Sequence, residues 1–214
     1  MTRRSTRAVA VACLALTLGG CNGDSRVRST PTTSGAVPAV LVIGDSNLFQ
    51  SGAQVDAALR DEGVEPTLHG VPGYGVKDLE YWLGQLGGLL ARDPDIVVVG
   101  LGTNDAEAAS DILQFPARLD ELMGTIGARR VIWLTHVDDR PGAPHDAGST
   151  VNQMVREAAT RWPNLTVLDF ATEIAADPTI LHADALHFSP HGMEVYADEI
   201  AAAVHTQLGA TSRG

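Results

Sequence analysis

Three polar residues of the chain could together carry out nucleophilic catalysis. Ser46 follows a short apolar run, and Asp184 and His187 stand three residues apart in the C-terminal part of the chain. The hydroxyl of Ser46 would attack a carbonyl carbon, and His187 would take its proton and later pass it to the leaving group. Asp184 would hold the imidazole in the correct tautomer and stabilise its charged form. These residue types point to acyl transfer through a covalent intermediate.

Acyl transfer also needs donors for the oxyanion that forms on the attacked carbonyl. The backbone N–H groups of Ser46 and Gly73 and the side-chain amide of Asn104 could supply three. A glycine at position 73 would let the backbone approach the substrate closely, because it has no Cβ. Gly75 lies two residues further on and is the alternative for this position.

Apolar strands that alternate with amphipathic helices would bring these residues together in an α/β fold. The pattern predicts strands at 39–43, 64–71, 96–101, 130–135 and 165–170, and helices at 47–61, 76–92, 108–126, 149–162 and 190–208. The helix at 108–126 could be interrupted or restarted at Pro116. Such alternation implies a parallel sheet with helices on both faces. In a flavodoxin-like strand order, 2-1-3-4-5, the loops that carry Ser46 and Asn104 would be neighbours at the ligand-binding edge.

The polar segments resemble, in the same order, the signature blocks of the SGNH (GDSL-type) hydrolases. The blocks are Gly44-Asp45-Ser46, Gly73, Gly102-Thr103-Asn104-Asp105 and Asp184-x-x-His187, and the resemblance covers about residues 38–208. It implies a three-layer α/β/α sandwich, a serine mechanism that uses neither a metal nor a cofactor, and activity on carboxylic esters. The sequence departs from the name-giving motif at Asn47, where that motif has Leu, and we regard this position as non-catalytic.

Two other functions remain open at this point. His182, Asp184 and His187 could instead ligate zinc in a metal-dependent hydrolase, because nitrogen and oxygen ligands at such spacings suit that ion. A degenerate site could also make the chain a non-catalytic binding module on the cell surface. Loss of activity in chelator, with survival of the Ser46→Ala variant, would support the metal. Absence of labelling of Ser46 by a fluorophosphonate, in a folded sample, would support the binding module.

The N-terminal region is typical of an exported lipoprotein. Residues 1–7 are basic, and residues 8–18 form an apolar run that is too short to span a membrane but has the length of a secretory signal. Leu18-Gly19-Gly20-Cys21 resembles a lipobox, whose cysteine is lipidated after cleavage. We expect a signal peptide at 1–20, a flexible tether rich in Ser, Thr, Pro and Gly at 21–37, and a hydrolase domain at 38–210. Lipidated Cys21 would anchor this domain to the extracytoplasmic face of the cell membrane.

The composition restricts the possible partners. The 214 residues carry a formal net charge of −11, from 15 basic and 26 acidic residues, so the chain lacks the clustered positive charge that nucleic-acid binding needs. Cleavage before Cys21 would remove three arginines and no acidic residue, so the mature chain would be still more acidic. Such a chain would repel polyanionic substrates, and we therefore expect neutral esters. Aromatic residues make up 5% of the chain and leave no obvious stacking platform for a sugar. We expect a monomer that acts on a small-molecule or carbohydrate ester, with the loop 136–148 bordering the pocket.

Overall fold

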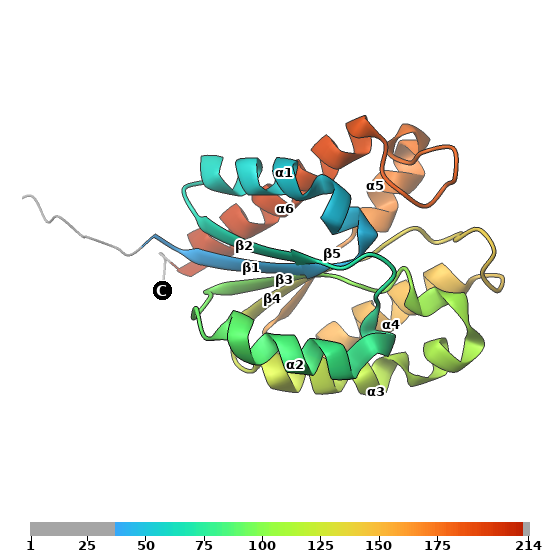
Figure 1. The fold of residues 1–214 in the computed structure, drawn as a ribbon, viewed down its shortest axis with the longest axis horizontal. Coiled ribbons are helices and arrows are strands. Elements are labelled where there is room, and N and C mark those ends of the chain that lie inside the picture. Colours follow the sequence, from blue (N-terminus) through green and yellow to red (C-terminus); the bar gives the residue numbers. More distant parts are fainter. Residues whose placement is uncertain (1–36, 212–214) are drawn as a thin grey trace, which may run out of the picture. The chain divides into compact units, whose positions relative to one another are not determined.

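The computed structural model describes residues 37–211, which form a parallel β-sheet between two layers of helices (Figure 1). The strands are β1 (Ala39–Gly44), β2 (Glu65–Gly70), β3 (Ile96–Gly100), β4 (Arg130–Leu134) and β5 (Leu165–Leu168). Neighbouring strands are parallel, and their order across the sheet is β2-β1-β3-β4-β5. The predicted fold class and strand order are therefore confirmed.

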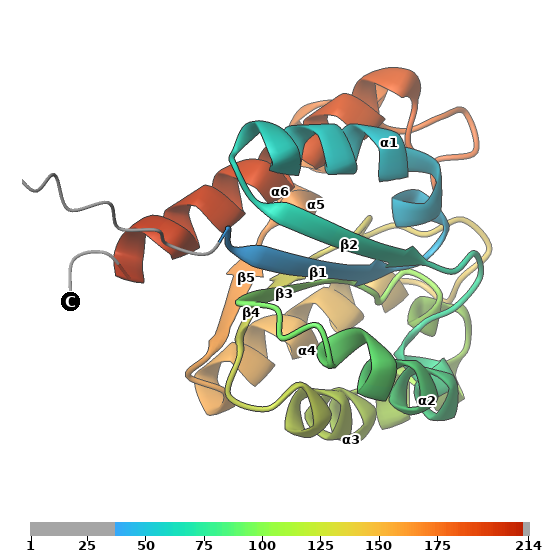
Figure 2. The same ribbon diagram turned by 60° about the vertical axis from the view of Figure 1, so that its left-hand side comes forward.

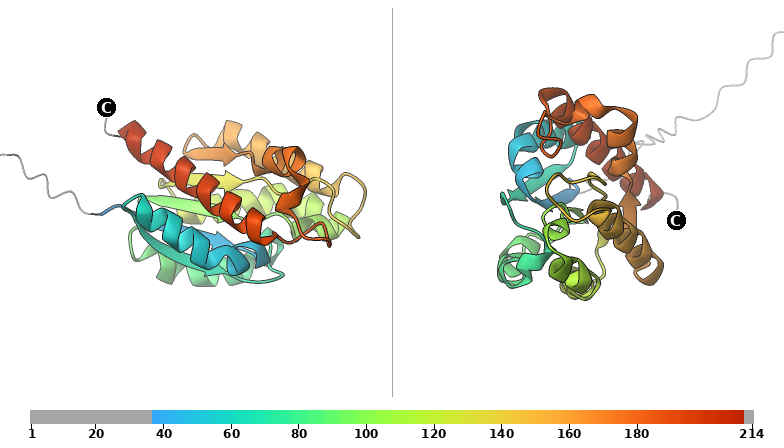
Figure 3. Two further views of the ribbon diagram at one scale, coloured as in Figure 1. Left: turned by 90° about the horizontal axis from the view of Figure 1, so that it is seen from above. Right: turned by 90° about the vertical axis from the view of Figure 1, so that its right-hand side faces the viewer.

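Three helices cover each face of the sheet in residues 37–211 (Figures 2 and 3). One face carries α1 (Ser46–Asp61), α5 (Phe170–Ala176) and α6 (Pro190–Thr211), and the other carries α2 (Leu79–Leu90), α3 (Ala109–Ile126) and α4 (Ala147–Arg161). Short 3-10 turns lie at Val76–Asp78, Asp105–Glu107 and Pro178–Ile180. Helices α1 and α6 pack side by side along the same face. This is the expected three-layer arrangement.

The central strands β1, β3 and β4 are buried on both faces because both helix layers pack against them. In β1, Ile43 belongs to a core that also contains Trp82 of α2 and Phe115 of α3, whereas its neighbour Val42 packs in a second core with Leu48 of α1. A strand with apolar side chains on both faces appears in the sequence as a continuous apolar run. This is why the central strands could be recognised from the sequence.

Some boundaries differ from the sequence expectation. Helix α3 continues through Pro116, because Phe115 and Leu119 on either side of it are buried in the same core and hold the helix against the sheet. Strand β5 ends at Leu168, before the predicted end, and Phe170 opens α5, a helix of 7 residues that is too short for its periodicity to be visible. Among residues 37–211, no helix is both long and apolar enough to cross a membrane.

Several loops meet at the edge of the sheet where the strands end, on the right in Figure 1. The loop after β1 leads into α1, the loop after β2 leads into α2, and the loop after β3 leads into α3. A hairpin at 181–189 reaches the same edge just before α6 and is closed by a bridge between Leu181 and Phe188. Parallel sheets bind their ligands at this edge.

Candidate active site

Ser46 is the first residue of α1 and follows directly on the end of β1. Asp45 caps the helix, because its Oδ1 accepts a hydrogen bond of 2.9 Å from the backbone N–H of Asn47. Gly44 makes the sharp turn possible, since a Cβ at this position would lie only 2.8 Å from the Cβ of Leu48. The turn presents the Ser46 hydroxyl at the start of the helix, where the N–H groups favour a negative charge.

The hairpin at 181–189 brings the other two predicted residues to Ser46. His187 Nε2 lies 3.2 Å from Ser46 Oγ, and His187 Nδ1 lies 2.7 Å from Asp184 Oδ2. The second carboxylate oxygen of Asp184 accepts from the backbone N–H groups of Leu186 and His187, at 3.1 and 3.0 Å. Ala185 adopts a left-handed φ of 51° at the tip of this turn. The three side chains therefore form one chain of hydrogen bonds, in the order that nucleophilic catalysis requires.

Asp184 is held in its charged form although it is largely exposed. Its hydrogen bonds to the His187 side chain and to the backbone N–H groups of His187 and Leu186 lower its pKa to about 2. A carboxylate beside Nδ1 requires the proton of the neutral imidazole to lie on that nitrogen. Nε2 is then the free base that faces Ser46.

The loop after β2 distinguishes between the two glycines that could supply an oxyanion donor. The N–H of Gly75 donates to Asp78 Oδ2 at 2.9 Å, so it is already occupied. Among the described residues, no partner is found for the N–H groups of Gly73 and Ser46. Gly73 has a φ of 81°, in the left-handed region, and is exposed at the turn. This arrangement favours Gly73 over Gly75 as a donor.

Asn104 lies behind the same loop and supports it. Its Nδ2 donates to the backbone carbonyl of Tyr74 at 2.8 Å and lies 3.5 Å from Asp45 Oδ2. The bond to Tyr74 uses one amide hydrogen, and the second is held only by the long contact to Asp45. It can therefore turn to an oxyanion when a substrate binds. The sequence indicated Asn104 but not its partner Tyr74, whose contribution is made by the backbone and leaves no signal in the side chain.

Two buried carboxylates stand beside the site without joining its chain of hydrogen bonds. Burial raises the pKa of Asp45 to about 6, although hydrogen bonds from Asn47 and Thr103 lower it. Asp105 accepts from the backbone N–H groups of Val76 and Lys77 at 2.8 and 2.6 Å, and burial raises its pKa to about 7. Both carboxylates bind nearby backbone groups and so act as structural supports.

The alternative metal site lacks a ligand cluster. Among residues 37–211, no three His, Cys, Asp or Glu side chains are grouped so that they could hold a metal ion. His187 is paired with Asp184, and His191, in the first turn of α6, is paired with Asp177 at 3.0 Å. His187 and His191 therefore each have a carboxylate partner of their own.

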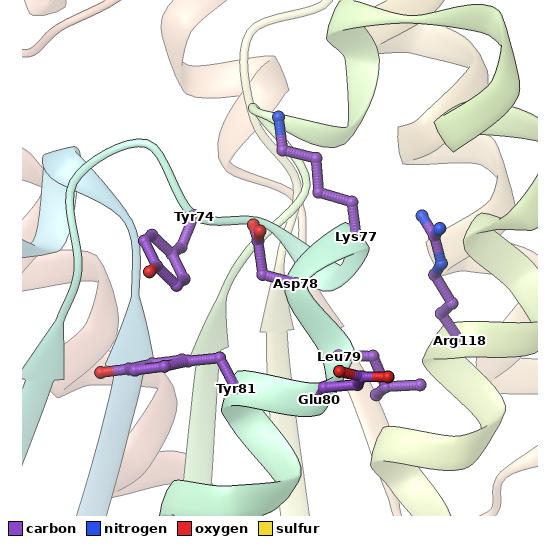
Figure 4. Close-up of a pocket in the computed structure, with 7 residues that line it drawn as sticks. All are labelled: Tyr74, Lys77, Asp78, Leu79, Glu80, Tyr81 and Arg118. Carbon is purple, nitrogen blue, oxygen red and sulfur yellow. The ribbon is translucent and has the colours of Figure 1, made fainter.

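A cavity of about 490 Å³ adjoins the loop that carries Gly73 (Figure 4). It is lined by Tyr74, Lys77, Asp78, Leu79, Glu80, Tyr81 and Arg118. The rings of Tyr74 and Tyr81 lie with their centroids 4.7 Å apart, so two of the few aromatic residues stand together at this cavity. Tyr74 belongs to both regions, because its ring lines the cavity while its carbonyl holds Asn104.

The loop 136–148 joins β4 to α4 and reaches this side of the site. Arg140 Nη2 lies 2.5 Å from Glu107 Oε1, and the other oxygen of Glu107 pairs with Lys77 at 2.6 Å. Lys77 is one of the side chains that line the cavity. The loop is thereby connected to the cavity through a network of three charged side chains.

Cys21 and the N-terminal segments at 1–20 and 21–36 lie outside the described residues. The predictions of a signal peptide, a tether and a lipid anchor therefore remain predictions.

Comparisons with known proteins give one family. No curated protein matches the chain. Among solved structures, the lipase/acylhydrolase from Enterococcus faecalis is 26% identical with a TM-score of 0.69, over 80% of this chain and 97% of that one. The C-terminal catalytic domain of peptidoglycan O-acetyltransferase A from Streptococcus pneumoniae is 22% identical with a TM-score of 0.63, over 80% and 95%. An acetylxylan esterase from Geobacillus stearothermophilus is 17% identical with a TM-score of 0.57, over 76% and 92%, and shares the fold.

The sequence itself matches the GDSL-like Lipase/Acylhydrolase family over residues 22–195, a range that contains Ser46, Gly73, Asn104, Asp184 and His187. The layers and the strand order agree with the fold that the resemblance of the four sequence blocks implied. The chain belongs to the GDSL-like lipase/acylhydrolase family of carboxylic ester hydrolases.

Proposed function

We propose that the protein hydrolyses carboxylic esters through an acyl-enzyme formed on Ser46. The observation that carries this proposal is the pair of contacts made by His187, 3.2 Å to Ser46 Oγ and 2.7 Å to Asp184 Oδ2. A base that touches both a hydroxyl and a carboxylate, in a member of an ester-hydrolase family, is arranged for nucleophilic catalysis.

The reaction would proceed in two halves. Ser46 Oγ attacks the ester carbonyl carbon while its proton moves to His187 Nε2, and the negative charge passes to the carbonyl oxygen. The N–H groups of Ser46 and Gly73 and the amide of Asn104 stabilise that oxyanion. The bond to the alcohol then breaks, and Nε2 returns its proton to the departing oxygen. In the second half, water gives a proton to Nε2 and attacks the acyl carbon, and the bond from that carbon to Ser46 Oγ breaks. Nε2 returns its proton to Oγ, which restores Ser46 and releases the carboxylic acid.

The substrate we propose is a short acyl or acetyl ester, with a carbohydrate as the alcohol. The cavity beside Tyr74 supports a sugar, since it combines two tyrosine rings with charged side chains that can bind hydroxyl groups. An acetylxylan esterase and a peptidoglycan O-acetyltransferase among the structures with this fold agree with such a substrate. The acidity of the chain, with a net charge of −11, favours a neutral ester.

We also propose that the protein is exported and held at the extracytoplasmic face of the membrane by lipidated Cys21. The support is the basic start, the short apolar run and the Leu18-Gly19-Gly20-Cys21 segment of the sequence. The long Ser- and Thr-rich segment that follows would let a monomeric hydrolase reach substrates away from the membrane surface.

A substrate panel tests the proposed function. We expect p-nitrophenyl acetate and butyrate to be hydrolysed faster than the octanoate and palmitate esters, and acetylated xylo-oligosaccharides to release acetate. The Ser46→Ala variant should lose at least about 10³-fold in kcat on every substrate, because the nucleophile is absent. The protein itself must remain folded, which circular dichroism of the variant would establish.

The same substrates also test whether the cavity beside Tyr74 recognises the sugar part of the ester. If the cavity binds the sugar, the Tyr74→Ala variant has a raised KM for acetylated oligosaccharides and an unchanged KM for p-nitrophenyl acetate. Equal KM values for wild type and variant on both substrates would rule out this cavity as the sugar site. Retention of ester hydrolysis by Ser46→Ala would rule out the serine mechanism.

A further inference from the structure

Asn47, the residue after the nucleophile, joins α1 to the hairpin that carries His187. Its Nδ2 donates to the carbonyl of Leu186 at 3.3 Å, and its Oδ1 accepts from the N–H of Phe188 at 3.2 Å. Leu186 and Phe188 are the two neighbours of His187 in the chain. The side chain therefore grips the backbone on both sides of the histidine.

The chemistry of this contact requires an amide. The carbonyl of Leu186 needs a donor and the N–H of Phe188 needs an acceptor, and Asn supplies both from one planar group. Asn47 is 7% exposed, so water competes little for either bond. Leucine, which occupies this position in the name-giving motif, has the same number of side-chain heavy atoms but is bulkier and could make neither bond.

The contact made by Asn47 also helps to fix the position of the hairpin relative to α1. Asp184 and His187 lie in one turn and are joined by two hydrogen bonds, so they move together. On its inner side, the hairpin is fixed by the ring of Phe188, which packs against Phe170 and Tyr196 with centroids 5.5 and 4.9 Å away. The distance from His187 to Ser46 depends on how the hairpin is held to α1, and Asn47 supplies two bonds at that junction.

We propose that Asn47 is a positioning residue, which clamps the backbone on both sides of His187 so that its imidazole stays in contact with Ser46. The inference rests on the proposed roles of Ser46 and His187. It gives a function to Asn47, the position at which the block Gly44-Asp45-Ser46 is followed by a residue other than the Leu of the name-giving motif.

The Asn47→Leu variant tests this clamp by removing both hydrogen bonds while keeping a branched side chain with the same number of heavy atoms. We expect kcat on p-nitrophenyl acetate to fall about 10- to 100-fold with KM changed less than about twofold, since a small displacement of the base slows proton transfer without altering substrate binding. The rate at which a fluorophosphonate labels Ser46 should fall by the same factor, because labelling needs the same base.

Asn164→Leu is the matched control. Asn164 also holds backbone groups, with Nδ2 donating to the carbonyls of Gly127 and Arg129 at 2.9 and 2.7 Å, but it lies just before β5, at the opposite edge of the sheet. It should lower the midpoint of thermal unfolding and leave kcat close to the wild-type value. Equal losses of kcat in the two variants would overturn the proposal, as would a raised KM with unchanged kcat for Asn47→Leu.

Asn47→Asp gives a second test, which also serves if Asn47→Leu does not fold. A neutral carboxylic acid can accept from Phe188 and donate to Leu186, whereas a carboxylate can only accept. The ratio of kcat for Asn47→Asp to kcat for wild type should therefore rise as the pH is lowered, and a flat ratio would overturn the proposal. The titratable groups around this position are Asp45, His136 and Tyr196, which line the small cavity beside it, and His182, Asp184 and His187 of the hairpin.

Ser46→Ala separates this inference from the proposed function. An inactive Ser46→Ala together with a fully active Asn47→Leu would refute the clamp alone. An active Ser46→Ala would refute the serine mechanism and the clamp with it.

Discussion

Asp184 shows at the scale of a single residue how a surface loop can hold a carboxylate in place beside a histidine. Its side chain is about half exposed, yet one oxygen accepts two backbone N–H groups and the other faces His187 Nδ1. These bonds keep its pKa near 2, well below the usual value of 3.8. Since the folded pKa is depressed, the contribution of this carboxylate to stability is present above about pH 4 and is lost as the pH falls toward 2.

Asp184→Asn should lower kcat by about 10² to 10⁴-fold, because an amide nitrogen facing Nδ1 favours the wrong tautomer of His187. KM should change little, since Asp184 does not touch the substrate in the proposed mechanism. Steady-state kinetics on p-nitrophenyl acetate would measure both. Asp177→Asn is the control: Asp177 pairs with His191 in a similar exposed contact outside the chain of hydrogen bonds, and its loss should leave kcat unchanged.

The sequence indicated the residues that carry chemistry better than those that position them. Ser46, Asp184 and His187 are recognisable because their types and order suit one reaction. Asn47 and Tyr74 are not, because one acts through two bonds to backbone atoms and the other through its own carbonyl. Such contacts depend on where the loops meet, and a single sequence does not contain that information.

At the scale of elements, a buried carboxylate joins the loop after β3 to the loop after β2. Asp105 accepts from the N–H groups of Val76 and Lys77, and Gly75 packs against the same carboxylate. The loop after β2 carries Gly73, so its position sets where that N–H points. Gly75 is therefore needed because a side chain would not fit beside Asp105, whereas Gly73 is needed because its φ lies in the left-handed region.

Gly75→Ala should destabilise this junction, because a Cβ would collide with the Asp105 carboxylate. We expect the free energy of unfolding to fall by about 1–3 kcal/mol and kcat to fall with it, as the loop that carries Gly73 is displaced. Urea denaturation and ester hydrolysis would measure the two effects. Gly84→Ala, in the interior of α2 with no atom within 4 Å of the new Cβ, should instead be neutral or stabilising by about 0.5–1 kcal/mol.

Most helices and strands could be predicted from local sequence patterns, and those that were missed have identifiable reasons. The central strands are apolar runs bounded by turns, so their positions could be predicted, whereas β2 contains Glu65, Pro66 and His69 and is not a continuous apolar run. The strand order followed from the flavodoxin-like arrangement and not from the runs themselves. Helix α5 was not predicted, because it is short and follows β5 almost directly. The continuity of α3 at Pro116 was not predicted either, because it depends on packing against the sheet. The hairpin at 181–189 has no apolar periodicity, and only its Asp184 and His187 marked it in the sequence.

Over the whole molecule, the N-terminal region and the hydrolase fold have different chemistry. The basic and apolar start is followed by a Ser- and Thr-rich segment, whereas residues 37–211 form the sheet and its helices. Both cysteines of the chain, Cys13 and Cys21, precede the sheet, so no disulfide can form within residues 37–211. The hydrolase fold must therefore be stabilised by its two apolar cores.

Cys21→Ser should release the protein from the membrane, because the thiol that would carry the lipid is absent. In cells that express the full chain, the wild type should enter the detergent phase on Triton X-114 partition and the variant should enter the aqueous phase. Esterase activity of the released protein should equal that of the wild type. Recovery of Cys21→Ser in the detergent phase would contradict lipid anchoring through this residue.

Covalent labelling of the folded protein by a fluorophosphonate, with the modified peptide located by mass spectrometry, tests the serine mechanism most directly. We expect one label per chain on Ser46, loss of ester hydrolysis in proportion to labelling, and no label in Ser46→Ala. Persistent activity in the fully labelled protein, or a folded wild type that takes up no label on Ser46, would contradict this mechanism.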